Sequence, residues 1–397
     1  MNSTKPRIAI VRGHHLSKED TLSYESLRDE FDFVCLSTNN PWFDHSEIVF
    51  PILNLPSAER FWQFLPGNIA NRMFGLADGL LGIGQWMIGL EQHLSGFDIV
   101  HSSDYCHLFT YQAALAKKRL GYKLVAIHYD NIPFARDSKP AARHVKYRTY
   151  EKVDAFFAMS ERARASLELE GVDSNRIFVI GNSVDTHKFR PRPEENHEWR
   201  ERLNIRPTDI VILFVGRVRA SKGVFELIYA TKRLLEDRQI DSSRLQVIIA
   251  GRGPRERQLH DRIRDLQIEK NVRLIGSVPH AEIHLLHNMA DIFVLPSIPR
   301  KYWQEQFGIV LIESMACAKP VISTLSGSIP EVIGDSGILV QPNDHFSLSE
   351  SLKRLILDSR LRNKLGKKAR ERALNLFDTR TVGKKLSNAY HTLLERH

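Results

Sequence analysis

Cysteine is scarce in this sequence. The three residues, Cys35, Cys106 and Cys317, are odd in number and far apart in the chain. Such a set forms neither a disulfide framework nor a zinc-binding signature, because both require cysteines at characteristic spacings. We expect buried, reduced thiols in a cytoplasmic protein.

Long hydrophobic runs are also missing. The longest apolar stretch, Met73–Leu90, contains Asp78, Gln85 and five glycines, which disfavours a helix across a bilayer. Near the start of the chain only four apolar residues, Ile8–Val11, follow one another. A signal-peptide core has roughly 7–15 such residues. The sequence therefore predicts a protein that is kept in the cytoplasm, where its contact with a membrane could only be peripheral.

Nucleic-acid motifs are absent too, although the formal net charge is +9. The sequence has no zinc-finger spacing, no RNP-type aromatic motif and no extended Lys/Arg block. The positive charge therefore favours other anionic partners, namely nucleotide phosphates or membrane headgroups. We expect no nucleic-acid partner.

What the sequence does contain is a regular alternation of short β-rich runs and helical patterns along 397 residues, too many for one typical domain. Continuous apolar strands separated by helices predict parallel sheets covered on both faces. The expected strands are Arg7–Val11, Phe33–Leu36, Asp98–His101, Lys123–His128, Ala155–Met159, Ile177–Ile180, Ile210–Val215, Gln246–Ala250, Val272–Ile275, Ile292–Leu295, Pro320–Ser323 and Gly337–Val340.

Two consecutive series of this kind predict an α/β protein with two doubly wound, Rossmann-like domains. We place the first domain at residues 1–187 and the second at 206–378, with a linker rich in proline and charge at 188–205. A final helix at 379–397 is expected to pack back on the first domain. Ligands of such sheets bind at the carboxyl ends of the strands, which would line a cleft between the domains.

A basic loop follows one of these strands, within Phe214–Gly223. The strand ends at Gly216, and a helix is expected to begin near Ser221–Gly223, where free N–H groups can bind an anion. Arg217 can hold phosphate oxygens as a planar fork, and Lys222 can act as a point charge. The alternative is a solvated basic loop. The order of residues is not that of a Walker loop.

Two glutamates, Glu305 and Glu313, flank the start of another expected helix. The N–H groups of Phe307, Gly308 and Ile309 would point at an anion there. Two helical turns, roughly 10 Å, suit two hydroxyl-bearing groups of one elongated ligand better than an acid/base pair. A solvated helix face is the alternative, but this helix is otherwise apolar, and a carboxylate on it is costly unless it is paired or liganded.

These segments resemble the retaining glycosyltransferases of family 4, which have the two-domain GT-B fold. The first half of the chain matches more weakly than the second. The matching segments are His128, Val179–Asp185, Phe214–Arg217, Lys222–Gly223, Ile249–Pro254, Leu295–Ser297, Glu305–Gly308, Glu313–Ala316, Lys319–Val321 and Ile329–Glu331.

The resemblance implies a role for each matched side chain in binding a nucleotide-diphosphate-sugar donor. Arg217 and Lys222, beside Gly216, would hold the diphosphate. Glu305 would meet hydroxyls of the donor sugar, and Glu313 would meet those of the ribose.

Other positions are implied by the same resemblance. Arg252 and the backbone near Val278 would contact the nucleobase. His128 would face the donor sugar near its anomeric carbon, although a lone histidine at a strand end otherwise indicates a structural hydrogen bond. The family often has paired glycines in its first loop, where this chain has Gly13 followed by His14-His15, so the backbone contact there would depend on Gly13.

The sequence contains no Ser/His/Asp set, zinc signature or Asp-x-Asp metal motif. We therefore expect no cofactor and a metal-independent transfer on one face of the sugar, in which the leaving phosphate accepts the proton of the incoming hydroxyl. Arg217, Lys222 and helix N-termini would stabilise its charge. His280, His284 and His287 could share a helix face and bind a metal, but we prefer a surface helix with incidental histidines.

The acceptor side of the site is less defined. Basic and aromatic residues of the first half could form a patch that contacts an anionic membrane and admits a lipid acceptor. The same residues could instead be ordinary surface and core, or could recognise a phosphorylated soluble sugar. The residues concerned are Lys139, Arg143, Lys146, Tyr147, Tyr150, Arg60–Leu65 and Arg72–Phe74.

The leading hypothesis is thus a retaining glycosyltransferase that uses a UDP- or GDP-sugar and a hydroxyl acceptor on a glycan, a lipid-linked sugar or a small molecule. Two alternatives keep the same fold. One is a nucleotide-sugar epimerase, and the other is a non-catalytic subunit that binds sugar nucleotides. The presence of all the charged residues that transfer needs counts against the second.

Overall fold

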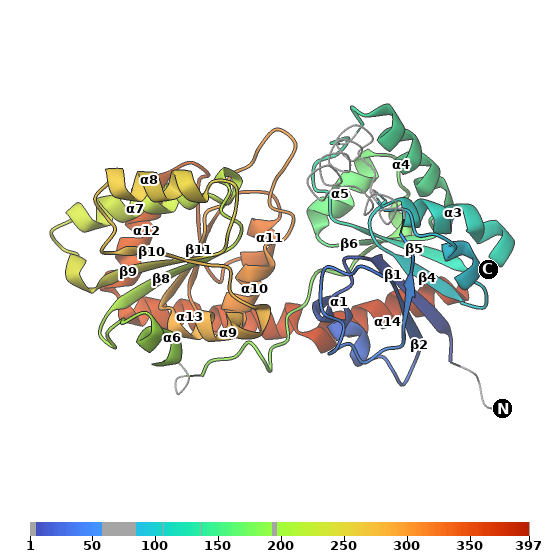
Figure 1. Cartoon of the computed structure of the whole chain (residues 1–397), viewed down its shortest axis with the longest axis horizontal. Coiled ribbons are helices and arrows are strands. Elements are labelled where there is room, and N and C mark those ends of the chain that lie inside the picture. The colour runs from blue at the N-terminus through green and yellow to red at the C-terminus, as the bar shows by residue number, and fades with distance from the viewer. Residues whose placement is uncertain (1–4, 58–84, 106, 136, 193–196, 397) are drawn as a thin grey trace. The chain divides into compact units, whose positions relative to one another are not determined.

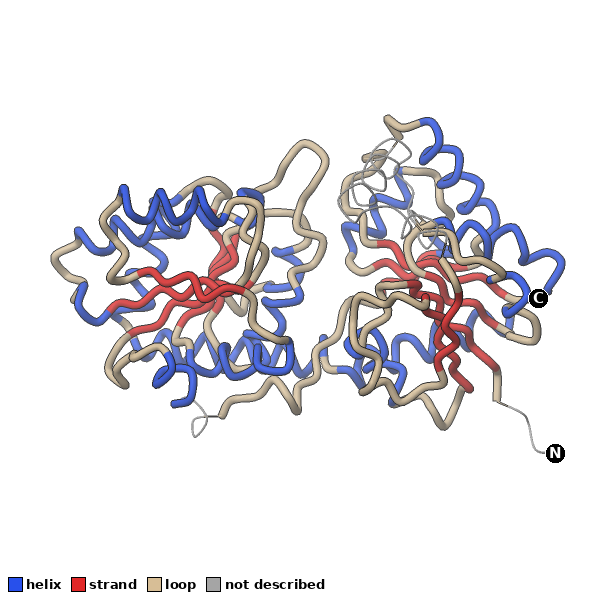
Figure 2. Tube along the Cα trace, in the orientation of Figure 1, coloured by secondary structure: helices blue, strands red, loops and turns tan. Residues whose placement is uncertain are grey.

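The computed structural model describes residues 5–57, 85–105, 107–135, 137–192 and 197–396. The chain divides into two compact units, which Figure 1 colours along the sequence. Unit 1 comprises Met1–Gly181 together with Val382–His397, and unit 2 comprises Asn182–Thr381. In both units helices lie on either side of the strands, as Figure 2 shows. The predicted pair of doubly wound α/β domains is confirmed.

Unit 1 contains a seven-stranded parallel sheet in the order β3-β2-β1-β4-β5-β6-β7. Its six predicted strands are present within a few residues of their expected bounds. The short edge strand β3 was missed, because only one of its four residues is fully buried and it includes an exposed asparagine. The strands are β1 (Arg7–Gly13), β2 (Asp32–Thr38), β3 (Ile52–Leu55), β4 (Ile99–Ser102), β5 (Lys123–His128), β6 (Ala155–Ala158) and β7 (Ile177–Val179).

Side chains of unit 1 alternate between two hydrophobic cores, one on each face of the sheet. Ala9 and Val11 of β1 belong to one core, whereas Ile8 and Ile10 belong to the other. This is why the central strand is apolar without interruption. The helices are α1 (Lys18–Glu25), α3 (Leu108–Leu120), α4 (Pro140–Lys152), α5 (Glu161–Leu169) and α14 (Thr379–Glu395), with short 3-10 turns at η2 (Leu90–His93) and η3 (Ser174–Arg176).

The last helix, α14, supplies apolar side chains to the second of these cores, including Val382, Leu386 and Leu393. Its Tyr390 is fully buried, and the Tyr390 hydroxyl lies 2.5 Å from Nδ1 of His101 in β4. The C-terminal end of the chain is therefore an integral layer of unit 1.

Unit 2 contains a six-stranded parallel sheet in the order β10-β9-β8-β11-β12-β13, with one continuous core. The strands are β8 (Ile210–Val215), β9 (Leu245–Ala250), β10 (Val272–Gly276), β11 (Ile292–Leu295), β12 (Val321–Thr324) and β13 (Ile338–Val340). The helices are α6 (His197–Arg202), α7 (Val224–Glu236), α8 (Glu256–Asp265), α9 (His280–Met289), α10 (Ile309–Ala316), α11 (Ile329–Ile333), α12 (His345–Leu357) and α13 (Ser359–Phe377), with 3-10 turns at η5 (Ala220–Lys222) and η6 (Ser242–Arg244).

Two of the cysteines lie in these cores. Cys35 and Cys317 are buried free thiols, and burial raises the pKa of each to about 12. The expectation of buried thiols is confirmed for this pair, whereas Cys106 lies outside the described residues. Among the helices that the structure describes, none is long and apolar enough to cross a bilayer.

The basic patch considered as one possibility for the first half does not include Lys146 and Tyr150, because both are buried. Lys146 is 1% exposed, and its Nζ lies 2.6 Å from Oε1 of Glu170 and 3.0 Å from Oδ1 of Asp137. Tyr150 is buried as well and donates a hydrogen bond of 3.0 Å to Glu170. Two carboxylates compensate the lysine charge inside unit 1, which helical spacing alone could not reveal. Residues 60–65 and 72–74 lie outside the described part of the chain.

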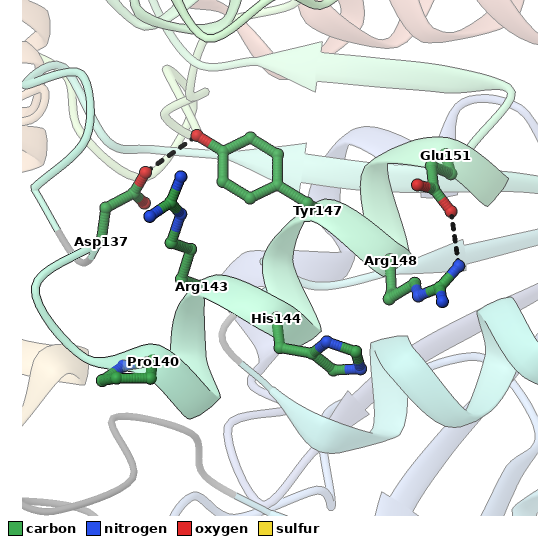
Figure 3. A pocket seen from close by; sticks show the side chains of 7 residues that line it. All are labelled: Asp137, Pro140, Arg143, His144, Tyr147, Arg148 and Glu151. Atoms are coloured by element: carbon green, nitrogen blue, oxygen red, sulfur yellow. Dashed lines mark hydrogen bonds and ion pairs between the residues drawn. The ribbon is translucent and has the colours of Figure 1, made fainter.

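The exposed side of α4 is mixed in charge rather than basic. A hollow of about 380 Å³ there is lined by Arg143, His144 and Arg148 together with Asp137 and Glu151 (Figure 3). The Tyr147 hydroxyl donates to Asp137 at 2.8 Å, and the Arg148 guanidinium lies 3.3 Å from Glu151. Carboxylates set among the cations weaken the attraction of this face for an anionic membrane.

The buried ion pair generates a prediction. Lys146→Met should destabilise unit 1 by about 3–5 kcal/mol, because it leaves two carboxylates without their cation. Arg148→Met is the matched control on the same helix, since its pair with Glu151 is more than half exposed and should contribute less than about 1 kcal/mol. Amide hydrogen exchange in β5 and β6, with unit 2 peptides as the internal reference, measures both. Equal effects of the two substitutions would contradict the assignment.

Candidate functional site

The strand order of unit 2 reverses between β8 and β11, which are neighbours in the sheet although β9 and β10 intervene in sequence. Connections leave these two strands in opposite directions, so a crevice opens beyond their carboxyl ends. The loop after β8 begins at Gly216, and the loop after β11 begins at Pro296. The predicted site residues of the second half follow these strands and their neighbours.

The loops after β8 and β9 contact each other through backbone. Gly216 N donates to Ala250 O at 3.0 Å, and Val218 N donates to Arg252 O at 3.0 Å. Gly251 has a φ of 134°, and a Cβ at that position would lie 2.0 Å from the Gly216 carbonyl oxygen. Only glycine permits this close approach. The contact fixes Arg217 and Arg252 at adjacent positions on the sheet edge.

A hollow of about 380 Å³ opens between these loops. It brings together four residues that the sequence assigns to donor binding: Gly216, Arg217, Arg252 and Val278. Both arginines are exposed, and Arg252 Nη1 lies 3.7 Å from Glu256. The remaining walls are mostly apolar and come from Val215, Ala250 and Ile283. An apolar hollow rimmed by guanidinium groups can accept a flat ring that carries phosphates.

The loops after β8 and β11 are also in direct contact. Gly223 has a φ of 71°, and a Cβ there would lie 1.7 Å from the Pro296 carbonyl oxygen. Ile298 N donates to Ser221 O at 2.8 Å. A 3-10 turn over Ala220–Lys222 precedes this glycine, so α7 begins at Val224, slightly later than predicted. The contact brings Lys222 to the loop that carries Glu305.

Lys222 and Glu305 form an ion pair, with Lys222 Nζ 2.7 Å from Glu305 Oε2. The Ser297 hydroxyl donates to the same oxygen at 2.7 Å, and Lys222 Nζ also lies 5.0 Å from the ring centroid of Trp303. Glu305 is almost buried, whereas Lys222 keeps about a fifth of its side chain exposed. Ser297 had no assigned role in its matched segment, and Trp303, two residues before Glu305, was not singled out.

The helix that carries Glu313 begins at Ile309, just after the predicted start, and Gly308 caps it in a left-handed conformation. The backbone N–H groups of Phe307, Gly308 and Ile309 lie at its N-terminal end, where an anion is favoured. The side chain of Phe307 is buried and stacks edge-on against Phe377 at 5.7 Å, so it belongs to the core. Ile309 is 48% exposed.

Glu313 is buried, and two histidines of α9 face its carboxylate. His280 Nε2 lies 3.2 Å from Oε1, and the fully buried His287 has its Nε2 3.5 Å from Oε2. Burial alone would raise the pKa of Glu313, but the interactions with His280 and His287 outweigh it and lower this pKa to about 2. Glu313 is therefore ionised near neutral pH.

The preferred interpretation of the α9 histidines as incidental surface residues is wrong for His287 and for the exposed His280, which contacts a buried carboxylate. His287 is 0% exposed, and the rings of His280, His284 and His287 all lie within about 6 Å of the Phe189 ring. The metal alternative finds no support either, because the described residues contain no group of three or more His, Cys, Asp or Glu side chains placed to hold a metal ion. The carboxylate of Glu313 accounts for the positions of His280 and His287 instead.

The two remaining predicted residues, His128 and Gly13, lie in unit 1. His128 is buried at the end of β5, with its ring 6.0 Å from that of Tyr105. Gly13 ends β1 with a φ of 59°, and a Cβ there would lie 2.1 Å from Gln85 Oε1, which accepts a hydrogen bond from His14 N at 3.3 Å. The side chain of Gln85 therefore occupies the space beside Gly13 and binds the backbone of the first loop.

The pairing of Glu313 with histidine can be tested through pH. Because its folded pKa lies below the ordinary value of 4.5, ionised Glu313 stabilises unit 2 above that pH, and the contribution is lost as pH falls towards 2. His287→Phe keeps a buried ring but removes a donor, which should raise the pKa of Glu313 and cost about 1–3 kcal/mol of unit 2 stability at neutral pH. Urea unfolding between about pH 3 and pH 7 measures this.

His284→Phe, on the same face of α9, is the matched control and should leave the pH dependence of unit 2 close to that of the native chain. Equal shifts in the pH dependence of unit 2 stability for His287→Phe and His284→Phe would show that His287 does not set the pKa of Glu313.

The model of the glycosyl transferases group 1 matches residues 195–372, and the model of Glycosyltransferase Family 4 matches residues 28–188. A D-inositol 3-phosphate glycosyltransferase of Kineococcus radiotolerans is 30% identical over 253 residues, 59% of this chain. The chain spans 57% of the length of that relative. An uncharacterized glycosyltransferase of Methanocaldococcus jannaschii is 25% identical over 312 residues, which are 75% of this chain and 76% of the relative.

Solved structures show the same architecture. Anabaena Alr3699/HepE in complex with UDP and glucose has a TM-score of 0.77 and 18% sequence identity, and the match covers 98% of this chain and all of the other. At this identity the likeness concerns the fold. The first half of the chain therefore carries a Glycosyltransferase Family 4 domain and the second half a group 1 glycosyl transferase domain, and the two together have the GT-B fold.

Proposed function

We propose that the protein is a retaining glycosyltransferase that moves a sugar from a nucleoside-diphosphate donor to a hydroxyl group of an acceptor. The observation that carries the proposal is the cluster of Lys222, Glu305 and Ser297 next to the hollow of Arg217 and Arg252, at the switch point of the unit 2 sheet. Nucleotide ligands favour this position in doubly wound sheets.

The donor would lie along the carboxyl edge of the sheet. The hollow lined by Val215, Val278 and Ile283 would take the nucleobase. The ionised carboxylate of Glu313 can accept hydrogen bonds from two vicinal hydroxyls, which is what a ribose presents. Arg217 and Lys222 would hold the diphosphate, Arg217 as a fork and Lys222 as a point charge.

Glu305 would orient the donor sugar. Its Oε2 already accepts hydrogen bonds from Lys222 and Ser297, so the position of this carboxylate is fixed by two partners. A sugar hydroxyl that donates to it would be held close to Lys222, and hence close to the phosphate that leaves. By the family resemblance, His128 of unit 1 would face the donor sugar near its anomeric carbon.

In the proposed reaction the bond between the anomeric carbon and the phosphate oxygen breaks. A new bond forms on the same face of the sugar between that carbon and the acceptor oxygen, and the acceptor proton passes to the leaving phosphate. The charge that develops on the phosphate would be balanced by Arg217, Lys222 and the N-terminal end of α10, without a metal ion. HepE was solved with UDP and glucose, so a UDP-sugar is the first donor to test.

Lys222→Ala should lower kcat for transfer by about 100-fold or more while it leaves the KM for the donor within a few-fold, because the lysine acts on charge that develops in the transition state. Glu305→Gln should lower kcat and raise the donor KM, since the amide loses both the charge and one acceptor position. Lys232→Ala, at an exposed pair with Glu236 on α7, is the control and should change neither constant.

Transfer is assayed with EDTA present, and proton NMR of the first product gives the anomeric configuration. An inverted configuration, or full turnover in Lys222→Ala, would overturn the mechanism. Conversion of the donor to an isomer without any glycosylated product would favour an epimerase instead.

A further inference from the structure

Unit 1 has its own switch point, and a second hollow lies there. The strand order reverses between β1 and β4, which are paired in the sheet. A hollow of about 310 Å³ lies at their carboxyl ends, and its lining includes Arg12 near the end of β1, His15 just after β1, and Ser103 and His107 after β4. Asp20 and Phe43 line the same hollow. No role in donor binding has been assigned to these residues.

A series of aromatic rings adjoins this hollow, and His15 and His107 of the series line it. Trp42 stacks on His14 with centroids 3.8 Å apart and meets His15 edge-on at 4.5 Å, and His15 in turn lies 5.2 Å from His107. Beside them Phe43 and Trp42 are 49% and 63% exposed. Exposed aromatic rings next to a polar hollow offer a surface for the C–H face of a sugar or cyclitol ring.

The imidazoles of His14 and His15 carry little charge at neutral pH. Burial, with a smaller contribution from His15, lowers the pKa of His14 to about 3, and burial also lowers the pKa of His15. Neutral imidazoles can exchange hydrogen bonds with hydroxyl groups, but they do not attract a phosphate as protonated imidazoles would.

The floor of the hollow combines one cation with one carboxylate. Arg12 is 4% exposed and already donates to the carbonyls of Val11 and His101, each at 3.2 Å, and to the Tyr24 hydroxyl at 3.0 Å. Asp20 accepts from Ser17 N at 3.1 Å and from Ser17 Oγ at 3.0 Å. A phosphate with a charge near −2 would meet this carboxylate and a guanidinium engaged by the protein. Uncharged hydroxyls could bond to both groups.

We propose that this hollow binds the acceptor, and that the group which enters it is an uncharged sugar or cyclitol ring rather than a phosphorylated one. The inference rests on the proposed function and narrows its substrate class. It differs from what a relative named for D-inositol 3-phosphate would suggest, because the charges around Arg12 and Asp20 favour hydroxyls over a phosphate.

Binding to the hollow is tested without donor, by saturation-transfer NMR on the full chain. The probes are matched pairs of myo-inositol with inositol 3-phosphate and methyl glucoside with glucose 6-phosphate. We expect the uncharged member of at least one pair to bind, at least about tenfold more tightly than its phosphate. Tighter binding of the phosphorylated members, or no binding of any ring at millimolar concentration, would overturn the proposal.

Phe43→Ala locates the site. Because Phe43 is half exposed, its removal should leave the fold intact while it weakens ring binding by about tenfold or more. Phe346→Ala, an exposed phenylalanine of unit 2, is the matched control and should have no effect. Unchanged ring binding in Phe43→Ala contradicts the site. A chain that binds rings in this way but neither binds nor consumes any nucleotide sugar would refute the proposed function and not the ring site.

Discussion

The ion pair between Lys222 and Glu305 links two loops that leave neighbouring strands of unit 2 in opposite directions. Its Nζ–Oε2 distance of 2.7 Å depends on the backbone contact of Gly223 with Pro296, which no other residue type at position 223 would permit. The pair neutralises a nearly buried carboxylate before any ligand arrives. A phosphate bound beside Lys222 would then share a cation that is already fixed in place, which lowers the cost of organising the site.

Glu313 is also a buried carboxylate that is stabilised by side chains of unit 2, but its partners differ from those of Glu305. Its carboxylate is buried beside two imidazoles instead of a lysine, and it stays ionised because these outweigh the effect of burial on its pKa. Side chains of unit 2 thus fix the carboxylates of both glutamates in positions where they can accept hydrogen bonds from a ligand. Arg217 and Arg252, by contrast, are exposed at the mouth of the adjacent hollow, where they remain accessible to an anionic ligand.

Much of this arrangement could be predicted from the sequence, because buried parallel strands leave a strong signal. The runs Ile210–Val215 and Lys123–His128 are apolar almost throughout, and their predicted bounds match β8 and β5. The family resemblance also singled out Arg252 and Val278 beside Gly216 and Arg217, and these four residues line one hollow. The half-exposed edge strand β3 has no such signal, since its apolar run is only four residues long and interrupted by an asparagine.

The errors concern side chains whose partners lie far away in sequence. Lys146 looked like a surface cation, but it is buried and its charge is paired with the carboxylates of Asp137 and Glu170. The α9 histidines looked incidental until Glu313, some thirty residues later, was placed against them. The ring-lined hollow of unit 1 joins residues 12–20 to residues 103–107 and could not be recognised from either segment alone.

The proposed transfer requires that the carboxyl edge of unit 2 bind a nucleoside-diphosphate sugar. A thermal-shift panel of UDP-, GDP- and ADP-sugars on the full chain, followed by amide hydrogen exchange with the best ligand, tests it most directly. One nucleotide class should raise the free energy of unfolding of unit 2 by about 2.7 kcal/mol when the ligand is present at a hundredfold excess over its Kd. Protection from exchange should centre on residues 215–223, 250–253, 277–283 and 305–313. Stabilisation by none of the three classes, or protection confined to other segments, would contradict it.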